Sequence, residues 1–478
     1  MDTALLQDID TLASLSLVEA AAAVADGSIS AVALTEACIA RTRRLDPQVN
    51  SVIWLDEAGA LEAAEAADKA RAAGAALGPL HGVPMAHKDM YYKAGQRSSC
   101  GSAIRRDFVP SVTATVLERL EGAGAVTFAG LNMAEFAQNP TGHNKHFGDC
   151  LNPWNPAHIT GGSSSGSGAA VAARFAFMAL GSDTGGSIRL PASACGVTGL
   201  KPTQTRISRF GVMPLSFSCD NVGPLARSAR DCARVMTVMA GHDPKDPTSA
   251  REPVPDYEAG LDGDLRGWRI GVPETHFLDG AAPSVVAAME AALAVLQARG
   301  ARVTRIRLPL LPELSAGFAV VSRCEAATIH GEWMREYPQD YAAHLSARLF
   351  PAYAIPATHY IEALSRRGPL LQEFCRQVFA DIDVLVTPTI PMELPTRAET
   401  DIDSGLPGTV ARFMAVSHNT RLVNYLGLPA ISAPCGFDSL GLPVGLQIIG
   451  RPFAEARVMR AADAFQRDTD WHLRLPSL

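Results

Sequence analysis

Short apolar runs alternate with helix-like stretches through the first half of the chain, and this alternation constrains the possible fold most strongly. The strand-like runs cover residues 83–87, 125–128 and 175–180, and the helix-like stretches cover residues 114–120 and 169–174. Strand-like sequence returns at residues 383–387 and 444–449. The pattern predicts an α/β fold, in which helices lie on the faces of a β-sheet that the C-terminal segment rejoins.

Composition and charge argue against several classes of protein. The net charge is −7 and no basic run is present, so neither a nucleic-acid partner nor binding to an anionic membrane is expected. No uncharged apolar run reaches the about 18 residues of a membrane span, and the N-terminal residues lack the pattern of a signal peptide, so we expect a cytoplasmic protein. Nine dispersed cysteines form no CxxC pair, and twelve histidines form no zinc-binding motif. We therefore expect reduced thiols, no metal and no cofactor.

Three reactive side chains lie in or beside loops of the predicted sheet. Ser163 lies in the Gly/Ser-rich tract 161–168, Ser187 follows two glycines, and Lys88 follows the strand-like run 83–87. Consecutive glycines let the backbone turn sharply and direct successive N–H groups at one place, which suits stabilisation of an oxyanion. A serine becomes a nucleophile when a neighbouring base removes its proton. No histidine except His158 lies near either serine motif, so Lys88 is the candidate base.

Lys88 can act as a base only in its neutral form. From a reference pKa near 10.4, fewer than roughly one lysine in a thousand is neutral at pH 7, but burial can lower the pKa by several units. The apolar run before Lys88 is compatible with such burial. The alternative is an ion pair between Lys88 and Asp89, and this motif alone does not decide between the two.

Other interpretations of the Gly/Ser-rich tract are less specific. Residues 162–166 match the GxSxG elbow of α/β-hydrolases, which would make Ser164 the nucleophile, but in so Gly/Ser-rich a tract the match carries little information. A phosphate-binding loop requires a following Gly-Lys-Ser/Thr, which is absent. A flexible linker is disfavoured because the tract lies within the α/β region.

The sequence around these side chains resembles the amidase-signature family. The lysine motif is matched by residues 82–89 (GVPMAHKD), the Gly/Ser-rich signature by residues 161–167 (GGSSSGS), and the nucleophile motif by residues 181–189 (GSDTGGSIR). Weaker matches extend the resemblance over about residues 10–455. The resemblance implies the fold of that family, a large mixed and twisted β-sheet covered by helices on both faces.

The resemblance also implies a role for each residue of the site. Ser187 attacks the carbonyl carbon, Ser163 in a cis peptide relays the proton, and Lys88 is the neutral base. The oxyanion hole is formed by backbone N–H groups of four consecutive residues, Thr184, Gly185, Gly186 and Ser187. We expect Asp183 and Arg189 to support the turn rather than to contact the substrate.

We expect residues 1–478 to form a single domain of the amidase-signature type. The hydrophobic content of 47%, against 19% charged residues, is enough for one large core. The expected regions are N-terminal helices at 1–65, a catalytic core at 66–235, a helix-rich substrate-shaping region at 240–375, and a return to the core at 376–478.

Two other functions compete with that of a stand-alone hydrolase. The glutaminase components of glutamyl-tRNA amidotransferases share these motifs, but they carry an acidic residue that grips the amino group of glutamine. The corresponding position here is Ser417, so a glutaminase component is the less favoured alternative. A binding protein that has lost catalysis is disfavoured because Lys88, Ser163 and Ser187 are all present.

The expected substrate is a small amide, aryl acylamide or carbamate. An uncharged substrate is favoured because no charged selector is evident in the sequence. Four residues near the motifs are candidates for the substrate pocket: Met90, Phe136, Gln138 and Ile390. Assembly into a homodimer is an expectation from the family resemblance alone, and no other protein partner is expected.

Overall fold

One mixed β-sheet of eleven strands runs through residues 3–478, which are the residues that the computed structural model describes. The strand order is β1-β3-β2-β4-β6-β5-β10-β11-β9-β7-β8. The strands are β1 (Val52–Leu55), β2 (Pro84–Lys88), β3 (Val126–Leu131), β4 (Met178–Asp183), β5 (Thr198–Lys201), β6 (Asn221–Ala226), β7 (Arg269–Pro273), β8 (Arg302–Ile306), β9 (Val384–Pro388), β10 (Ala430–Phe437) and β11 (Pro443–Ile449). The predicted fold class is therefore confirmed.

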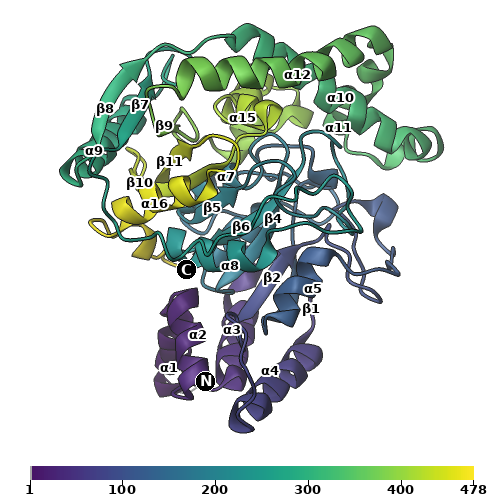
Figure 1. The fold of residues 1–478 in the computed structure, drawn as a ribbon. Coiled ribbons are helices and arrows are strands. Elements are labelled where there is room, and N and C mark those ends of the chain that lie inside the picture. Colours follow the sequence, from purple (N-terminus) through teal and green to yellow (C-terminus); the bar gives the residue numbers. More distant parts are fainter. Residues whose placement is uncertain (1–2) are drawn as a thin grey trace.

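Helices cover both faces of this sheet (Figure 1). They are α1 (Thr3–Ser14), α2 (Leu17–Asp26), α3 (Ala31–Leu45), α4 (Glu57–Ala72), α5 (Thr115–Gly122), α6 (Ser165–Ala172), α7 (Arg189–Cys195), α8 (Ala229–Met239), α9 (Pro283–Ala298), α10 (Leu311–Glu336), α11 (Ala343–Leu349), α12 (Ala357–Val378), α13 (Arg397–Thr400), α14 (Thr409–Val416), α15 (Arg421–Leu426) and α16 (Glu455–Gln466). Helices α8, α16 and α9 form one row against the central strands, and α6 and α7 contact those strands from the other side.

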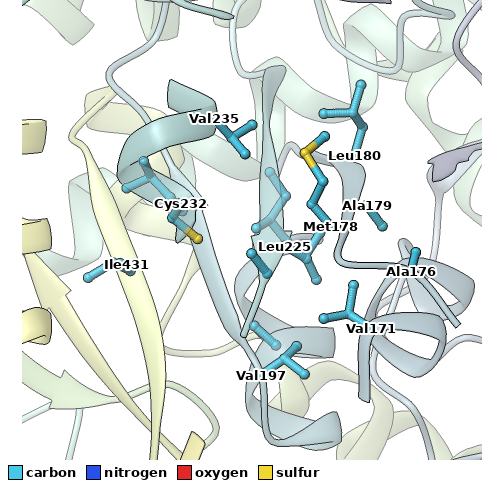
Figure 2. Packing of buried hydrophobic residues seen from close by; sticks show 14 of the residues in the cluster. Val171, Ala176, Met178, Ala179, Leu180, Val197, Leu225, Cys232, Val235 and Ile431 are labelled. Carbon is cyan, nitrogen blue, oxygen red and sulfur yellow. The ribbon is translucent and has the colours of Figure 1, made fainter. Parts of the chain in front are cut away.

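The core lies between the central strands and these helices. Figure 2 shows Met178 and Leu180 of β4, Leu225 of β6, Cys232 of α8 and Ile431 of β10 as members of one buried cluster. Every residue of β4 and β6 is buried, which explains why both strands lack a polar face. Burying each large apolar side chain contributes about 1.5–3 kcal/mol, so this layer is a major source of stability.

The register of the sheet determines where the candidate site can form. Strands β2 and β4 are parallel neighbours, and His87 pairs with Leu180. The carboxyl ends of parallel strands meet at one edge of a sheet. Lys88 therefore ends β2 at the same edge at which Asp183 ends β4.

Most of the predicted elements are present, with ends shifted by at most four residues. Two regions differ from the prediction. The segment expected to contain only N-terminal helices includes the short edge strand β1, and the helix-rich region 240–375 includes β7 and β8. Strand β8 is exposed or half-buried throughout, so it lacks the apolar run by which buried strands are recognised.

None of the helices within residues 3–478 combines the length and the apolar character that crossing a bilayer requires. The location of the protein in the cell stays a prediction from the sequence.

Candidate active site

Lys88 lies between two serine hydroxyl groups at the end of strand β2. Its Nζ atom is 2.7 Å from Ser163 Oγ and 2.8 Å from Ser182 Oγ, and all three residues are buried. Ser163 follows Gly162 through a cis peptide bond, as the family resemblance implied. The structure thus brings Lys88 and Ser163, which are far apart in sequence, into direct contact.

Burial determines the protonation of Lys88. It lowers the pKa of Lys88 to about 7, although the carboxylates of Asp220 and Asp183 act in the opposite direction. Lys201 is a useful comparison, because burial also lowers its pKa to about 7. The Lys201 Nζ atom, however, donates to the Pro202 carbonyl at 2.7 Å. Both lysines can therefore be neutral near pH 7, but only Lys88 contacts a predicted catalytic serine.

Two alternatives drawn from the sequence do not fit the observed contacts. Asp89 makes no ion pair with Lys88, and its carboxylate instead accepts hydrogen bonds from Ser99 N at 2.8 Å and Trp54 Nε1 at 3.2 Å. Ser164, the nucleophile of the GxSxG interpretation, is fully buried. Its Oγ donates to the Ser182 carbonyl at 3.3 Å, so it fastens the start of α6 to β4.

Ser187 lies on the turn between β4 and α7, and the carboxylate of Asp183 holds this turn. Arg189 Nη2 donates to Asp183 Oδ1 at 2.9 Å, and both side chains are fully buried. Burial alone would raise the pKa of Asp183, but the Arg189 guanidinium holds this pKa well below its usual range. Arg189 also donates to Asn424 Oδ1 and Gln447 Oε1, each at 2.6 Å. Asp183 and Arg189 therefore support the turn, as expected.

The backbone of this turn leaves N–H groups available for an oxyanion. Within residues 3–478, the N–H groups of Thr184, Gly185 and Ser187 have no hydrogen-bond partner. Gly186 differs from the prediction, because its N–H donates to Asp183 Oδ1 at 2.8 Å. Gly186 therefore shapes the turn, and three free donors remain of the four predicted.

A cavity of about 800 Å³ opens beside Ser187, which is within the usual range for small-molecule sites. Its walls are formed by the turn 184–187, the segment 137–140 and residues of helices α10, α11, α14 and α15. In the described chain, the Ser187 hydroxyl makes no hydrogen bond, so it is free to meet a ligand. Among the same residues, no group of three or more His, Cys, Asp or Glu side chains is arranged to hold a metal ion.

The four candidate pocket residues lie in different places. Gln138 lines the cavity, and neither atom of its buried side-chain amide has a hydrogen-bond partner within the described residues. Met90, Phe136 and Ile390 are buried in the apolar core and do not line this cavity. Phe136, for example, stacks on Trp333 with ring centroids 5.4 Å apart. A contact between these three residues and substrate stays a prediction that the cavity does not support.

Several residues of the site were not predicted from the sequence. Ser182, which contacts Lys88, lies inside the nucleophile motif but received no role. The cavity wall also carries three arginines, Arg323, Arg348 and Arg421. Charged side chains that the sequence did not make evident therefore line the cavity, and an uncharged substrate stays a prediction. Arg421 could have been predicted, because it lies four residues after Ser417 in the sequence. Arg323 and Arg348 lie in the helix-rich region 240–375, whose packing the sequence pattern does not reveal.

Comparisons with known proteins place this geometry in context. The profile of the Amidase family matches residues 33–459. The A-type subunit of the glutamyl-tRNA(Gln) amidotransferase of Chloroflexus aggregans is 40% identical over 487 aligned positions, which cover 97% of this chain and 98% of that protein. A chain from a vestigial protein complex, reported to reveal the origins of an s-triazine catabolic enzyme, has a TM-score of 0.89 and 34% identity, with 95% and 98% of the two chains covered. The peptide amidase of Stenotrophomonas maltophilia has a TM-score of 0.83 and 30% identity, with 97% and 98% covered.

Proposed function

The chain belongs to the amidase-signature family, and we propose that it is a serine hydrolase that cleaves the C–N bond of a small amide or carbamate, with Ser187 as the nucleophile. The contact between Lys88 Nζ and Ser163 Oγ, at 2.7 Å, is the observation that carries this proposal. A lysine with a pKa of about 7 can accept a proton near neutral pH. Ser187 lines the neighbouring cavity, and the Ser164 N–H donates to the Ser187 carbonyl at 3.4 Å, which supports a nucleophile beside Ser163.

The proposed reaction proceeds through an acyl-enzyme. Ser187 Oγ forms a bond to the carbonyl carbon while its proton passes to Ser163 Oγ, and the Ser163 proton passes to Lys88 Nζ. The carbonyl oxygen becomes an oxyanion that the free N–H groups of the turn stabilise, and each such donor contributes about 3 kcal/mol. The proton then returns through Ser163 to the leaving nitrogen, and the C–N bond breaks. Water repeats these steps to release the acid and regenerate Ser187.

The region 240–375 contributes to substrate selection in this proposal. Helices α10 and α11 belong to it, and both supply residues to the cavity wall beside Ser187. We propose that the whole chain acts as one catalytic domain in which this region shapes the substrate site. Assembly into a homodimer and a cytoplasmic location belong to the same proposal.

The experiment compares the wild type with Ser187→Ala and Lys88→Ala on a panel of amides, nitroanilides, esters and aryl carbamates, without metal or ATP. Release of amine by the wild type should fall by at least about a hundredfold in both variants, because each removes part of the acyl-transfer machinery. Ser167→Ala is the matched control. Ser167 lies in the same tract as Ser163 but donates to the Leu180 carbonyl at 2.9 Å and does not line the cavity. Full activity of Ser187→Ala would contradict the proposed nucleophile.

A glutaminase component of an amidotransferase is the second candidate function. The amidotransferase relatives, at 40% identity over nearly the whole chain, favour it. Ser417, which occupies the position of the acidic residue of the glutaminase components, argues against this function. Its Oγ accepts hydrogen bonds from Arg421 at 2.7 and 3.0 Å. A guanidinium at this place repels the amino cation of glutamine. Hydrolysis of glutamine that required a second protein and ATP would establish this alternative over the stand-alone enzyme.

A further inference from the structure

Three arginines from three helices line one side of the cavity. Arg323 lies on α10, Arg348 on α11 and Arg421 at the start of α15. Arg323 is exposed, and the other two are half-buried. These residues are far apart in the sequence, so only the packing of the three helices brings their charges together.

None of the three guanidinium groups has a carboxylate partner among the described residues. No Asp or Glu lies within ion-pair distance of any of them, although most other arginines of the chain form such pairs. Arg348 Nη1 makes a long hydrogen bond of 3.4 Å to the Gln138 carbonyl, and its buried Nε has no partner. Arg421 donates only to Ser417 Oγ and to Met414, all of them uncharged acceptors.

The charges of the three arginines also act on one another. Burial, and then the positive charges of Arg421 and Arg323, lower the pKa of Arg348 to about 10. Burial and Arg323 lower the pKa of Arg421 to about 10. Both of these pKa values lie well above 7, so the guanidinium groups of Arg348 and Arg421 bring positive charge to the cavity that no carboxylate pairs with. Asp403, the acidic residue of the cavity wall, faces His344 Nδ1 at 3.2 Å rather than an arginine.

This positive cluster lies beside the turn that carries Ser187. The Arg421 Cγ atom is 3.8 Å from the point at which a side chain on Gly185 would begin. The preceding residue, Thr420, donates from Oγ1 to the Gly185 carbonyl at 2.5 Å. Arg348 donates to the backbone carbonyl of Gln138, and the side-chain amide of Gln138 has no partner among the described residues. Arg421 is therefore held beside the backbone that presents the free N–H groups, and Arg348 is held beside Gln138.

We propose that the physiological substrate carries a carboxylate that Arg323, Arg348 and Arg421 hold in the cavity. The planar guanidinium group suits a carboxylate because it can form two parallel hydrogen bonds to it. Binding of this anion supplies the negative charge that the cluster lacks, and Gln138 supplies a further polar contact. The inference rests on the proposed function, since the carboxylate belongs to the amide or carbamate that Ser187 cleaves.

The first test uses matched substrates. Succinamate carries one amide and one carboxylate, and succinamide replaces that carboxylate with an uncharged group of the same shape. We expect the wild type to prefer succinamate in kcat/KM by at least about tenfold, which corresponds to about 1.4 kcal/mol of differential binding. Arg348→Gln and Arg421→Gln should each reduce this preference severalfold or more. Arg335→Gln should keep it, because Arg335 is an exposed residue of α10 outside the cavity wall.

The second test is independent of catalysis. We expect succinate, the acid product, to raise the Tm of Ser187→Ala, whereas succinamide should not, because only a ligand that binds the folded state stabilises it. The double variant Arg348→Gln/Arg421→Gln, made in the Ser187→Ala background, should lose this rise. N-acetylglycine and N-acetylglycinamide test in the same way whether the carboxylate belongs to the amine side of the substrate.

The outcomes separate this inference from the proposed function. Equal hydrolysis of both members of each pair, unchanged in the arginine variants, would overturn the inference and leave the hydrolase intact. If no amide or carbamate is hydrolysed, the proposed function fails, and the Tm experiment still decides whether the cluster binds a carboxylate. A rise in Tm that sulfate produces as strongly as succinate would also overturn the inference, because it would indicate binding of any anion.

Discussion

At the scale of single residues, the pKa of Lys88 connects the structure to the pH dependence of activity. Burial lowers this pKa to about 7, and only the deprotonated amine can accept the proton of Ser163. Activity should therefore be lost as the pH falls. We expect kcat/KM to drop about tenfold per pH unit below pH 7 and to level off above it. A profile measured from about pH 5 to about pH 9 that stayed flat through this range would contradict the role of Lys88 as the base.

The same residue should reduce the stability of the protein. The pKa of Lys88 is about 7 in the folded state, against about 10.4 in an unfolded chain, so folding releases a proton between these values. The wild type should thus gain stability as the pH rises from about 7 to about 10. Lys88→Met removes the buried amine but leaves Ser163 and Ser182 without this partner. We expect a net gain of roughly 2 kcal/mol in the free energy of unfolding at pH 7.

Denaturation in urea at several pH values measures this effect. The difference between Lys88→Met and the wild type should shrink as the pH rises, because the unfolded lysine then also loses its proton. Lys201 has a similar pKa in both proteins and cancels in the comparison. A difference that did not change with pH would show that Lys88 is not buried as a neutral amine.

At the scale of elements, the turn between β4 and α7 is the most constrained part of the site. Gly186 has φ +129°, and a side chain there would overlap the Thr420 hydroxyl and lie 2.9 Å from Leu190 Cγ. Gly186→Ala should therefore lower the free energy of unfolding by about 2–3 kcal/mol and reduce kcat/KM at least about tenfold. Urea denaturation and steady-state kinetics measure both effects.

Gly280→Ala is the control for this substitution. Gly280 also has a positive φ, +71°, but no atom lies within 4 Å of the position of an added Cβ. The Gly280→Ala variant should lose some stability through backbone strain and keep its activity. If Gly186→Ala behaved like Gly280→Ala, the turn would not be held as tightly as its contacts indicate.

The sequence predicted the elements of the site better than the contacts between them. Strand β2 and the turn before α7 were recognisable because buried strands are apolar and sharp turns need glycine. The role of Gly186 was not recognisable from the sequence, because the hydrogen bond from its N–H to Asp183 depends on how the turn closes. Strand β8 was missed because it lies at the edge of the sheet and is exposed or half-buried throughout, whereas β7 was missed although four of its five residues are buried.

At the scale of the whole molecule, the C-terminal segment completes the middle of the sheet. Strands β9, β10 and β11 lie between β5 and β7, and Gln447 of β11 contacts Arg189 beside the turn of Ser187. A fragment of residues 1–375 would therefore leave the inner edges of β5 and β7 unpaired. We expect this fragment to show no cooperative unfolding transition in urea followed by near-UV circular dichroism. A native-like, cooperatively unfolding fragment would show that the sheet can form without its centre.

Long-range packing also explains why the arginines of the cavity wall could not be predicted from the sequence. Arg323, Arg348 and Arg421 carry no motif, and each alone resembles an ordinary surface arginine. They line one cavity only because α10, α11 and α15 meet there. The motifs around Lys88, Ser163 and Ser187 lie on adjacent strands and turns, so the chemistry of the site was more accessible from the sequence than its specificity.

The most direct test of the account is identification of the residue that carries the acyl group. The wild type would be quenched in acid during turnover of an activated carboxylate-bearing ester, and its peptides analysed by mass spectrometry. We predict one added acyl mass on the peptide that contains Ser187, its absence in Ser187→Ala, and slow formation in Lys88→Ala. An acyl group on Ser164 or on any other residue, or turnover by Ser187→Ala at the rate of the wild type, would contradict the account.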